Sequence, residues 1–123
     1  MESASFEQLD VYRLAAELAD EIRPLVRHWE TADLWSVGIQ MIRAADSIGA
    51  NIAEAYGRGT RPDQARFLFM ARGSAYELQH WLARAHATGL ACPAGAEDRA
   101  KRIGQMLNGL IRSLGRSPSN RPT

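Results

Sequence analysis

Arginines that gather around one break in the chain are the first residues in this sequence that could do chemistry. The break covers residues 57–60, and the arginines around and after it are Arg58, Arg61, Arg66 and Arg72. A helix is predicted to restart after the break, so its N-terminal N–H groups add partial positive charge to that of the guanidinium groups. Arginine also holds a phosphate through two donors at once. These four residues are therefore candidates for nucleic-acid binding.

A second polar group lies on the segment before the break, and it consists of Arg43, Ser47, Asn51 and Glu54. Its members follow one another at three- and four-residue steps, which places them on one side of a helix. Asn51 is a poor helix former that bonds readily to nearby backbone, so its position in an apolar helix indicates a local hydrogen-bonded cluster. We interpret this cluster as structural, fixing the register of helices or sealing an oligomer. The alternative is that it belongs to the phosphate site.

Residues that carry catalysis or bind metals do not form a known arrangement in this sequence. His80 and His86 are six residues apart, which separates them by about 240° around a helix, whereas a metal site needs ligands that converge. Cys92 has no basic neighbour in the sequence, and there is no Gly-x-Ser-x-Gly turn and no P-loop. We therefore expect no enzyme activity, no catalytic residue, no metal, no cofactor and no small-molecule substrate.

The size and composition of the chain fit one globular domain. It has 123 residues, of which 46% are hydrophobic and 24% are charged, as in an ordinary folded domain. We expect this domain to cover residues 1–116. Residues 117–123 have no apolar side chain to bury, so we expect them to form a disordered tail.

The single cysteine excludes an intramolecular disulfide. The acidic start of the sequence is unlike a signal peptide and no apolar run is long enough to span a membrane, so we expect a cytoplasmic protein without a membrane partner.

Charge is unevenly distributed along the chain. Residues 1–60 hold ten acidic side chains and five arginines, whereas residues 61–123 hold four acidic side chains, nine arginines and Lys101. The folded helices can interleave these charges in space, so that no charged face forms. Two other consequences also stay open. The second half can form a basic face for a polyanion, or its arginines can pair with acidic residues in the first half of a neighbouring copy, such as Glu17, Asp20 and Glu21.

Apolar residues recur at three- and four-residue steps in four segments, which predicts four amphipathic helices. The predicted helices cover residues 6–29, 34–57, 61–88 and 96–115. No segment alternates apolar and polar residues in the manner of a strand. Helices of this length with short connections predict an all-α fold, an antiparallel up-down-up-down four-helix bundle. Its core is expected to contain Leu18, Ile48, Ile52, Leu68, Leu78 and Leu110.

Residues with special backbone preferences predict where these helices begin and end. Pro24 cannot donate a backbone hydrogen bond, so the first helix should kink or lose its regular form in its last turn. Thr31 or Asp33 is expected to cap the second helix, and Thr60 to cap the third. Gly89 is expected to end the third helix in the left-handed conformation.

The sequence holds more large apolar side chains than one narrow core absorbs. Ile39 and Ile42 lie off the main apolar seam of the second helix, and Trp35 and Trp81 add two large aromatic rings. Surplus apolar surface marks an interface, and tryptophan is common at the centre of such contacts. We therefore expect these four residues to lie in an oligomer interface.

Several segments together resemble a known protein family. They are QMIRAADSIGANIAEAYGR at residues 40–58, FL at 67–68, ARGSAYEL at 71–78 and FEQLDVY at 6–12. This pattern is similar to the four-helix-bundle proteins encoded in intervening sequences of bacterial large-subunit rRNA genes, to which retroelement accessory variability proteins are distantly related. The resemblance covers about residues 6–114. The sequence departs from the family at Ile42, where a second arginine is common, and at Ala55, where glycine is usual.

The resemblance implies a cytosolic bundle that assembles as a ring, commonly a homopentamer, without a cofactor or a known reaction. For the retroelement relatives it also implies a basic surface that holds RNA and a reverse transcriptase. Two functional hypotheses follow for this chain. The first is a non-catalytic, self-associating accessory protein that binds RNA or a nucleic-acid enzyme such as a reverse transcriptase. The second is an oligomeric scaffold that binds only protein.

Overall fold

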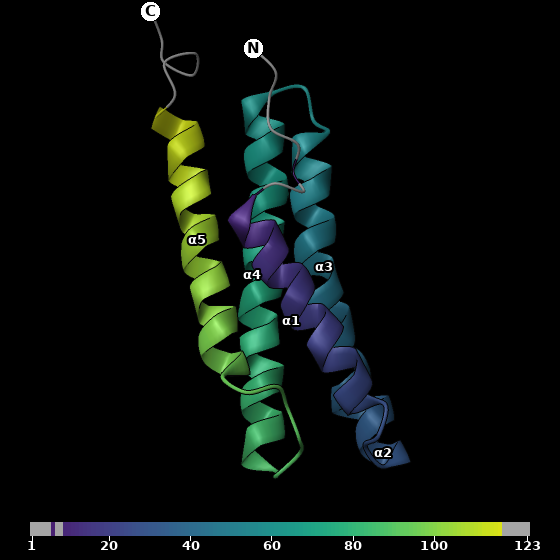
Figure 1. Cartoon of the computed structure of the whole chain (residues 1–123). Helices are drawn as coiled ribbons and strands as arrows, with labels where there is room; N and C mark the ends of the chain where they lie inside the picture. Colours follow the sequence, from purple (N-terminus) through teal and green to yellow (C-terminus); the bar gives the residue numbers. More distant parts are fainter. Residues whose placement is uncertain (1–5, 7–8, 117–123) are drawn as a thin grey trace, which may run out of the picture.

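The computed structural model describes residues 6 and 9–116, and the regular structure in this part of the chain is entirely helical. The long helices are α1 (Asp10–Val26), α3 (Ile39–Tyr56), α4 (Arg61–Ala87) and α5 (Ala96–Arg116). A short helix α2 (Thr31–Asp33) and a π-helix η2 (Leu34–Gly38) lead directly into α3. The predicted all-α fold is therefore confirmed, and its four long helices are consistent with a four-helix bundle (Figure 1).

Each long helix packs against two others. The most extensive contacts join α3 to α4 and α4 to α5, while α1 packs against α3 and α5. The helix α1 therefore lies across the bundle from α4, as Figure 1 shows, with α1 in front. The connection from α3 to α4 lies at the top of this view, and the connections that follow α1 and α4 lie at the bottom.

The core lies between the four long helices and contains most of the residues predicted for it. Leu18, Ile48, Ile52 and Leu78 are completely buried, and Leu68 is 3% exposed. Burying a side chain of this size stabilises the fold by about 1.5–3 kcal/mol. The sixth predicted residue, Leu110, is only partly buried and packs against the edge of the core.

The first helix is shorter than predicted at both ends. Its first helical residue is Asp10, and its last is Val26, two residues after Pro24. The missing N–H of Pro24 removes one hydrogen bond from this last turn. Beyond it, the N–H of Trp29 bonds to the Val26 carbonyl in a tight turn, and the Trp29 indole N–H donates to the Ala91 carbonyl over 3.0 Å. That second bond ties the end of α1 to the connection between α4 and α5.

The predicted cap of the second helix is wrong. The helical conformation begins at Thr31 itself, after Glu30, and the N-cap makes no side-chain hydrogen bond. The π-helix η2 follows directly and ends at the buried Gly38. A Cβ atom on Gly38 would lie 2.7 Å from Val26 Cγ1 and 3.3 Å from the Asp33 carbonyl oxygen, so only glycine allows this approach of η2 to the end of α1.

The boundaries of α4 follow the sequence signals closely. The Thr60 side chain accepts a hydrogen bond from the Asp63 N–H over 3.3 Å, as expected for an N-cap. Gly89 has φ of 75°, so the predicted left-handed terminator is confirmed. The disordered tail predicted for residues 117–123 lies outside the described part of the chain.

Candidate nucleic-acid interface

Two of the predicted arginines lie against one aromatic ring at the start of α4. The guanidinium carbons of Arg58 and Arg66 lie 4.5 Å and 4.6 Å from the centre of the Phe67 ring. Phe67 follows Arg66 directly in α4, while Arg58 reaches it from the connection after α3. The electron-rich face of the ring favours both cations, so the aromatic side chain holds two positive charges close together.

These two arginines also form ion pairs with their own helix neighbours. Arg58 Nη2 lies 2.8 Å from Glu54 Oε2, and Arg66 Nη2 lies 3.5 Å from Asp63 Oδ1. All four side chains in these pairs are at least 37% exposed. Exposed pairs of this kind contribute about 0–1 kcal/mol, so a phosphate can replace the carboxylate at low cost.

Arg61 supplies a third cation to this end of α4. It occupies the first position of the helix, is half-buried, and makes no hydrogen bond or ion pair with the residues that the structure describes. A hydrogen bond holds the connection that precedes Arg61 in place. The Gln64 side-chain amide donates it to the Arg58 carbonyl over 3.1 Å. In addition, the Arg58 Nε atom is buried without a hydrogen-bond partner among the described residues. Positive charge at this helix start is thus only partly neutralised within the chain.

Arg72 lies apart from the other three predicted arginines. Its Nη1 donates to Asn108 Oδ1 of α5 over 2.7 Å, and its guanidinium carbon lies 4.8 Å from the Phe69 ring centre and 5.8 Å from that of Tyr76. The structure therefore places this residue on the side of α4 that faces α5, apart from Phe67 and its two arginines.

A cavity of about 190 Å³ opens next to the arginines at this end of the bundle. One of its lining residues is Gln64, whose side chain also donates a hydrogen bond to the carbonyl of Arg58 in the connection before α4. Burial at its edge raises the pKa of Tyr56 above the ordinary value for a phenol. The full lining combines apolar side chains with an amide, a hydroxyl and a phenol, and consists of Ala55, Tyr56, Gln64, Leu68, Leu110, Ser113 and Leu114.

The predicted structural cluster on α3 is only partly assembled. The Asn51 amide donates to the Ser47 carbonyl over 2.9 Å, and the Ser47 and Ser74 hydroxyl oxygens are 2.7 Å apart, which joins α3 to α4. Glu54 turns instead toward Arg58. Arg43 is exposed and makes no hydrogen bond or ion pair with any residue in the described part of the chain. Sequence reasoning missed Ser74 because it lies on another helix.

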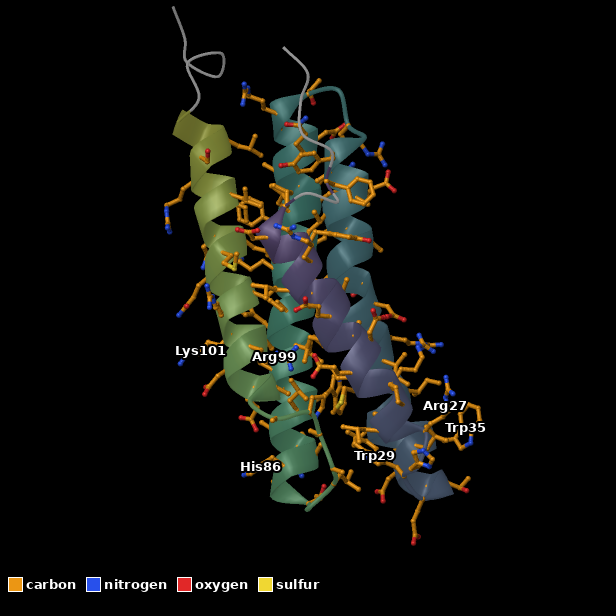
Figure 2. All side chains as sticks on the ribbon, viewed as in Figure 1. Arg27, Trp29, Trp35, His86, Arg99 and Lys101 are labelled. Carbon is orange, nitrogen blue, oxygen red and sulfur yellow. The ribbon has the colours of Figure 1, made fainter. Side chains whose placement is uncertain are left out.

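The four residues predicted for an oligomer interface have different surroundings. Trp35 is 67% exposed, and Figure 2 shows its ring pointing away from the bundle near α2. Ile39, Ile42 and Trp81 are half-buried. The Trp81 indole N–H donates to Glu77 Oε2 over 3.3 Å within α4.

A further exposed apolar surface lies on α4, beyond the four residues predicted for the interface. Phe69, Met70 and Tyr76 are each 45–49% exposed. A helical projection of α4 could have found this surface, because these residues lie away from the seam that contains Leu68 and Leu78.

Residues suited to metal binding or nucleophilic catalysis are dispersed. Within residues 6 and 9–116, no three side chains of His, Cys, Asp or Glu are grouped so that they could hold a metal ion. Burial, and secondarily the charge of Glu97, raises the pKa of the Cys92 thiol above its ordinary value. This shift disfavours the reactive thiolate. None of the described helices is long and apolar enough to cross a membrane.

Comparison with known proteins decides the family of this chain. The model of the 23S rRNA-intervening sequence protein family matches residues 7–111. The chain belongs to this family. A crystal structure of a protein with unknown function from the S23 ribosomal protein family of Bacteroides thetaiotaomicron is similar to it, with a TM-score of 0.75 and 25% sequence identity. The similarity covers 83% of this chain and 98% of the Bacteroides protein. No curated protein matches the chain significantly.

Membership of the 23S rRNA-intervening sequence protein family agrees with the resemblance found in the sequence. The matched region begins before α1 and ends inside α5, so it includes all of α1, α3 and α4, most of α5 and the arginines around Phe67.

Proposed function

We propose that this protein is a non-catalytic, self-associating accessory protein that binds single-stranded RNA at the start of α4. The observation that carries the proposal is the pair of guanidinium groups that both lie against the Phe67 ring. Arg61 adds a third cation beside them, and Arg72 lies farther along the same helix. Guanidinium groups in weak, exposed ion pairs exchange their carboxylates for phosphates when a polyanion arrives.

The cavity beside the arginines favours RNA over a simple anion. Its volume of about 190 Å³ is below the roughly 300–1,000 Å³ of pockets that enclose a drug-sized ligand, so it suits one planar base. Tyr56 offers a ring for stacking, and Gln64 and Ser113 offer hydrogen-bonding groups for a base edge. Unpaired bases of single strands are recognised by such a combination of stacking and edge contacts.

The assembly and the setting are part of the same proposal. We propose a cytoplasmic ring, a homopentamer with up-down-up-down bundles as subunits, which repeats the arginine site around one axis. Repetition of a weak site raises the overall affinity for a long strand without new contacts. A reverse transcriptase is the protein partner that fits an RNA-holding ring, as the resemblance to retroelement accessory proteins implies.

A scaffold that binds only protein is the second candidate function. The exposed Asp20 of α1 makes no ion pair with the described residues, so it is open to an arginine of a neighbour. Glu17 is exposed as well, but it lies within electrostatic reach of Arg99 of its own chain. Glu21 is not open in this way, because Arg99 of the same chain donates to both of its carboxylate oxygens, over 2.9 Å and 2.6 Å.

An RNA titration separates the two candidates. We would measure binding of a fluorescent single-stranded RNA by anisotropy over a range of salt concentrations. Phosphate contacts require that affinity falls as salt rises, with a slope of about −0.7 per neutralised phosphate for a single strand. Changing the cluster with R58E, R61E and R66E should abolish binding.

The control is a second triple variant with the same change of charge elsewhere. It carries glutamate at three exposed arginines outside the cluster, namely R27E, R84E and R102E. This control should retain most of the affinity, and circular dichroism should show wild-type helicity for both variants. Equal losses in the two triple variants would mean that net charge alone attracts RNA, and absence of wild-type binding at low salt would favour the scaffold.

A further inference from the structure

The outer face of α4 carries the largest exposed apolar side chains on the long helices. We name this surface the α4 patch, and it consists of Phe69, Met70 and Tyr76, with Gly73 between them. Arg72 lies over two of its rings. Aromatic residues, methionine and arginine are the types enriched at protein interfaces, and exposed apolar patches of this kind mark interaction sites.

A groove with the opposite character lies between α1 and α3. It has a volume of about 160 Å³, and its walls are made mainly of small side chains, with two carboxylates. The residues that line it are Tyr12, Ala15, Ala16, Ala19, Asp20, Ala45, Asp46, Gly49 and Ala50. A Cβ atom on Gly49 would lie 3.2 Å from the Tyr12 ring, so the groove depends on a close approach of the two helices. We name this surface the α1–α3 groove.

The α4 patch and the α1–α3 groove share no residue and lie on different sides of the bundle. The helix α4 packs against α3 and α5, and α1 lies across from it (Figure 1). One copy can therefore use both surfaces at once, each with a different neighbour. Contacts between unlike surfaces are heterologous, and they form a closed ring when the rotation between copies allows closure.

We infer that the α4 patch of one copy docks into the α1–α3 groove of the next copy. This inference rests on the proposed self-association and names the surfaces that carry it. Large side chains of the patch fill a groove whose own side chains are small. The charges also match, because Arg72 lies against the patch while Asp20 lines the groove. Asp46 lines the groove as well, but it is paired with Arg23 of its own chain. The Asp20 carboxylate makes no ion pair with any residue in the described ranges, so it is open to an arginine of the neighbour.

Two single variants test the two surfaces separately. M70E places a charge within the patch, and A50E fills the groove; both positions are exposed, so neither change disturbs the core. Light scattering at micromolar protein should give each variant a mass near the 13.6 kDa monomer. The matched controls Q105E and A94E add the same charge at exposed positions outside both surfaces and should retain the wild-type mass.

Mixing the two variants distinguishes this contact from a symmetric one. The M70E copy keeps an intact groove and the A50E copy keeps an intact patch, so an equimolar mixture should contain a species of twice the monomer mass. In this pair, the unused patch carries the M70E glutamate and the unused groove carries the A50E glutamate. These two surfaces repel each other, so no further copy is added. A mixture that stays monomeric would overturn the inference, as would M70E or A50E with the wild-type mass.

Failure of the proposed function gives a different result. A monomeric wild type would refute self-association as a whole, whereas an oligomeric wild type with unaltered single variants would refute only these surfaces. If M70E loses RNA affinity in the anisotropy assay without a change of mass, the α4 patch binds RNA bases, and the docking inference is overturned.

Discussion

Replacing Gly38 by alanine tests whether the π-helix is fixed by the end of α1. The new Cβ would lie 2.7 Å from Val26 Cγ1, and Val26 is β-branched and buried, so it cannot rotate away freely. Overpacking of this kind costs about 1–3 kcal/mol. Alanine also favours the helix over glycine by about 1 kcal/mol, so the net loss of stability should be about 0–2 kcal/mol.

A matched glycine isolates the steric part of this effect. Gly109 lies inside α5, and a Cβ there would meet no atom within 4 Å. G109A should therefore stabilise the protein by about 1 kcal/mol. The difference between the two variants, about 1–3 kcal/mol, corresponds to the contact with Val26. Urea unfolding of both proteins at one fixed concentration measures it, because self-association makes stability depend on concentration.

A double variant checks the cause. V26A removes Cγ1, so G38A should cost less in that background than in the wild type, with a coupling energy of about 0.5–3 kcal/mol. If G38A is as stable as G109A, the close approach of η2 to α1 does not constrain the fold. If V26A gives no rescue, the strain of G38A arises elsewhere, for example at the Asp33 carbonyl.

The remaining predictions concern two titrating groups. Hydrogen bonds from Arg99 hold the pKa of Glu21 below its ordinary value, so this pair stabilises the fold above the pKa of the unfolded carboxyl and is lost as pH falls through the lower folded pKa. E21Q should therefore reduce the difference in urea midpoint between neutral and acidic pH. The control E17Q, at a carboxylate without a hydrogen bond in the described chain, should reduce this difference less. Equal effects of the two variants would contradict the role of the hydrogen bonds. Burial and the charge of Glu97 raise the pKa of Cys92, so iodoacetamide at neutral pH should modify the folded protein more slowly than the urea-unfolded protein, and E97Q should be modified slightly faster than wild type. A folded protein that reacts as fast as the unfolded chain would refute the effect of burial.

Helical periodicity was sufficient to predict the core because burial on a helix depends on spacing along the chain. Ile48, Ile52 and Leu78 are buried for this reason. The start of α4 was also predictable, since the Thr60 cap and the bond from Asp63 lie within three residues of each other. Both features are local in the sequence.

Features that depend on distant segments could not be predicted in this way. The π-helix arises where Gly38 meets Val26, and no local pattern encodes that approach. Likewise, the predicted polar cluster included Ser47 but missed Ser74, because its hydroxyl comes from 27 residues farther along the chain. The arginine at position 72 was grouped with the others by sequence distance, although α4 presents it toward α5.

The position of α1 between α3 and α5 has a consequence for synthesis of the chain on the ribosome. The pairs α3–α4 and α4–α5 are neighbours in sequence and can form as each new helix emerges, whereas α1 is made first and one of its two partners is made last. At about 5–20 residues per second, α5 follows α1 after several seconds. During this interval the apolar side of α1 is only partly covered, so the nascent chain is open to chaperones, and to α3–α5 segments of neighbouring nascent chains on the same messenger, until α5 has emerged.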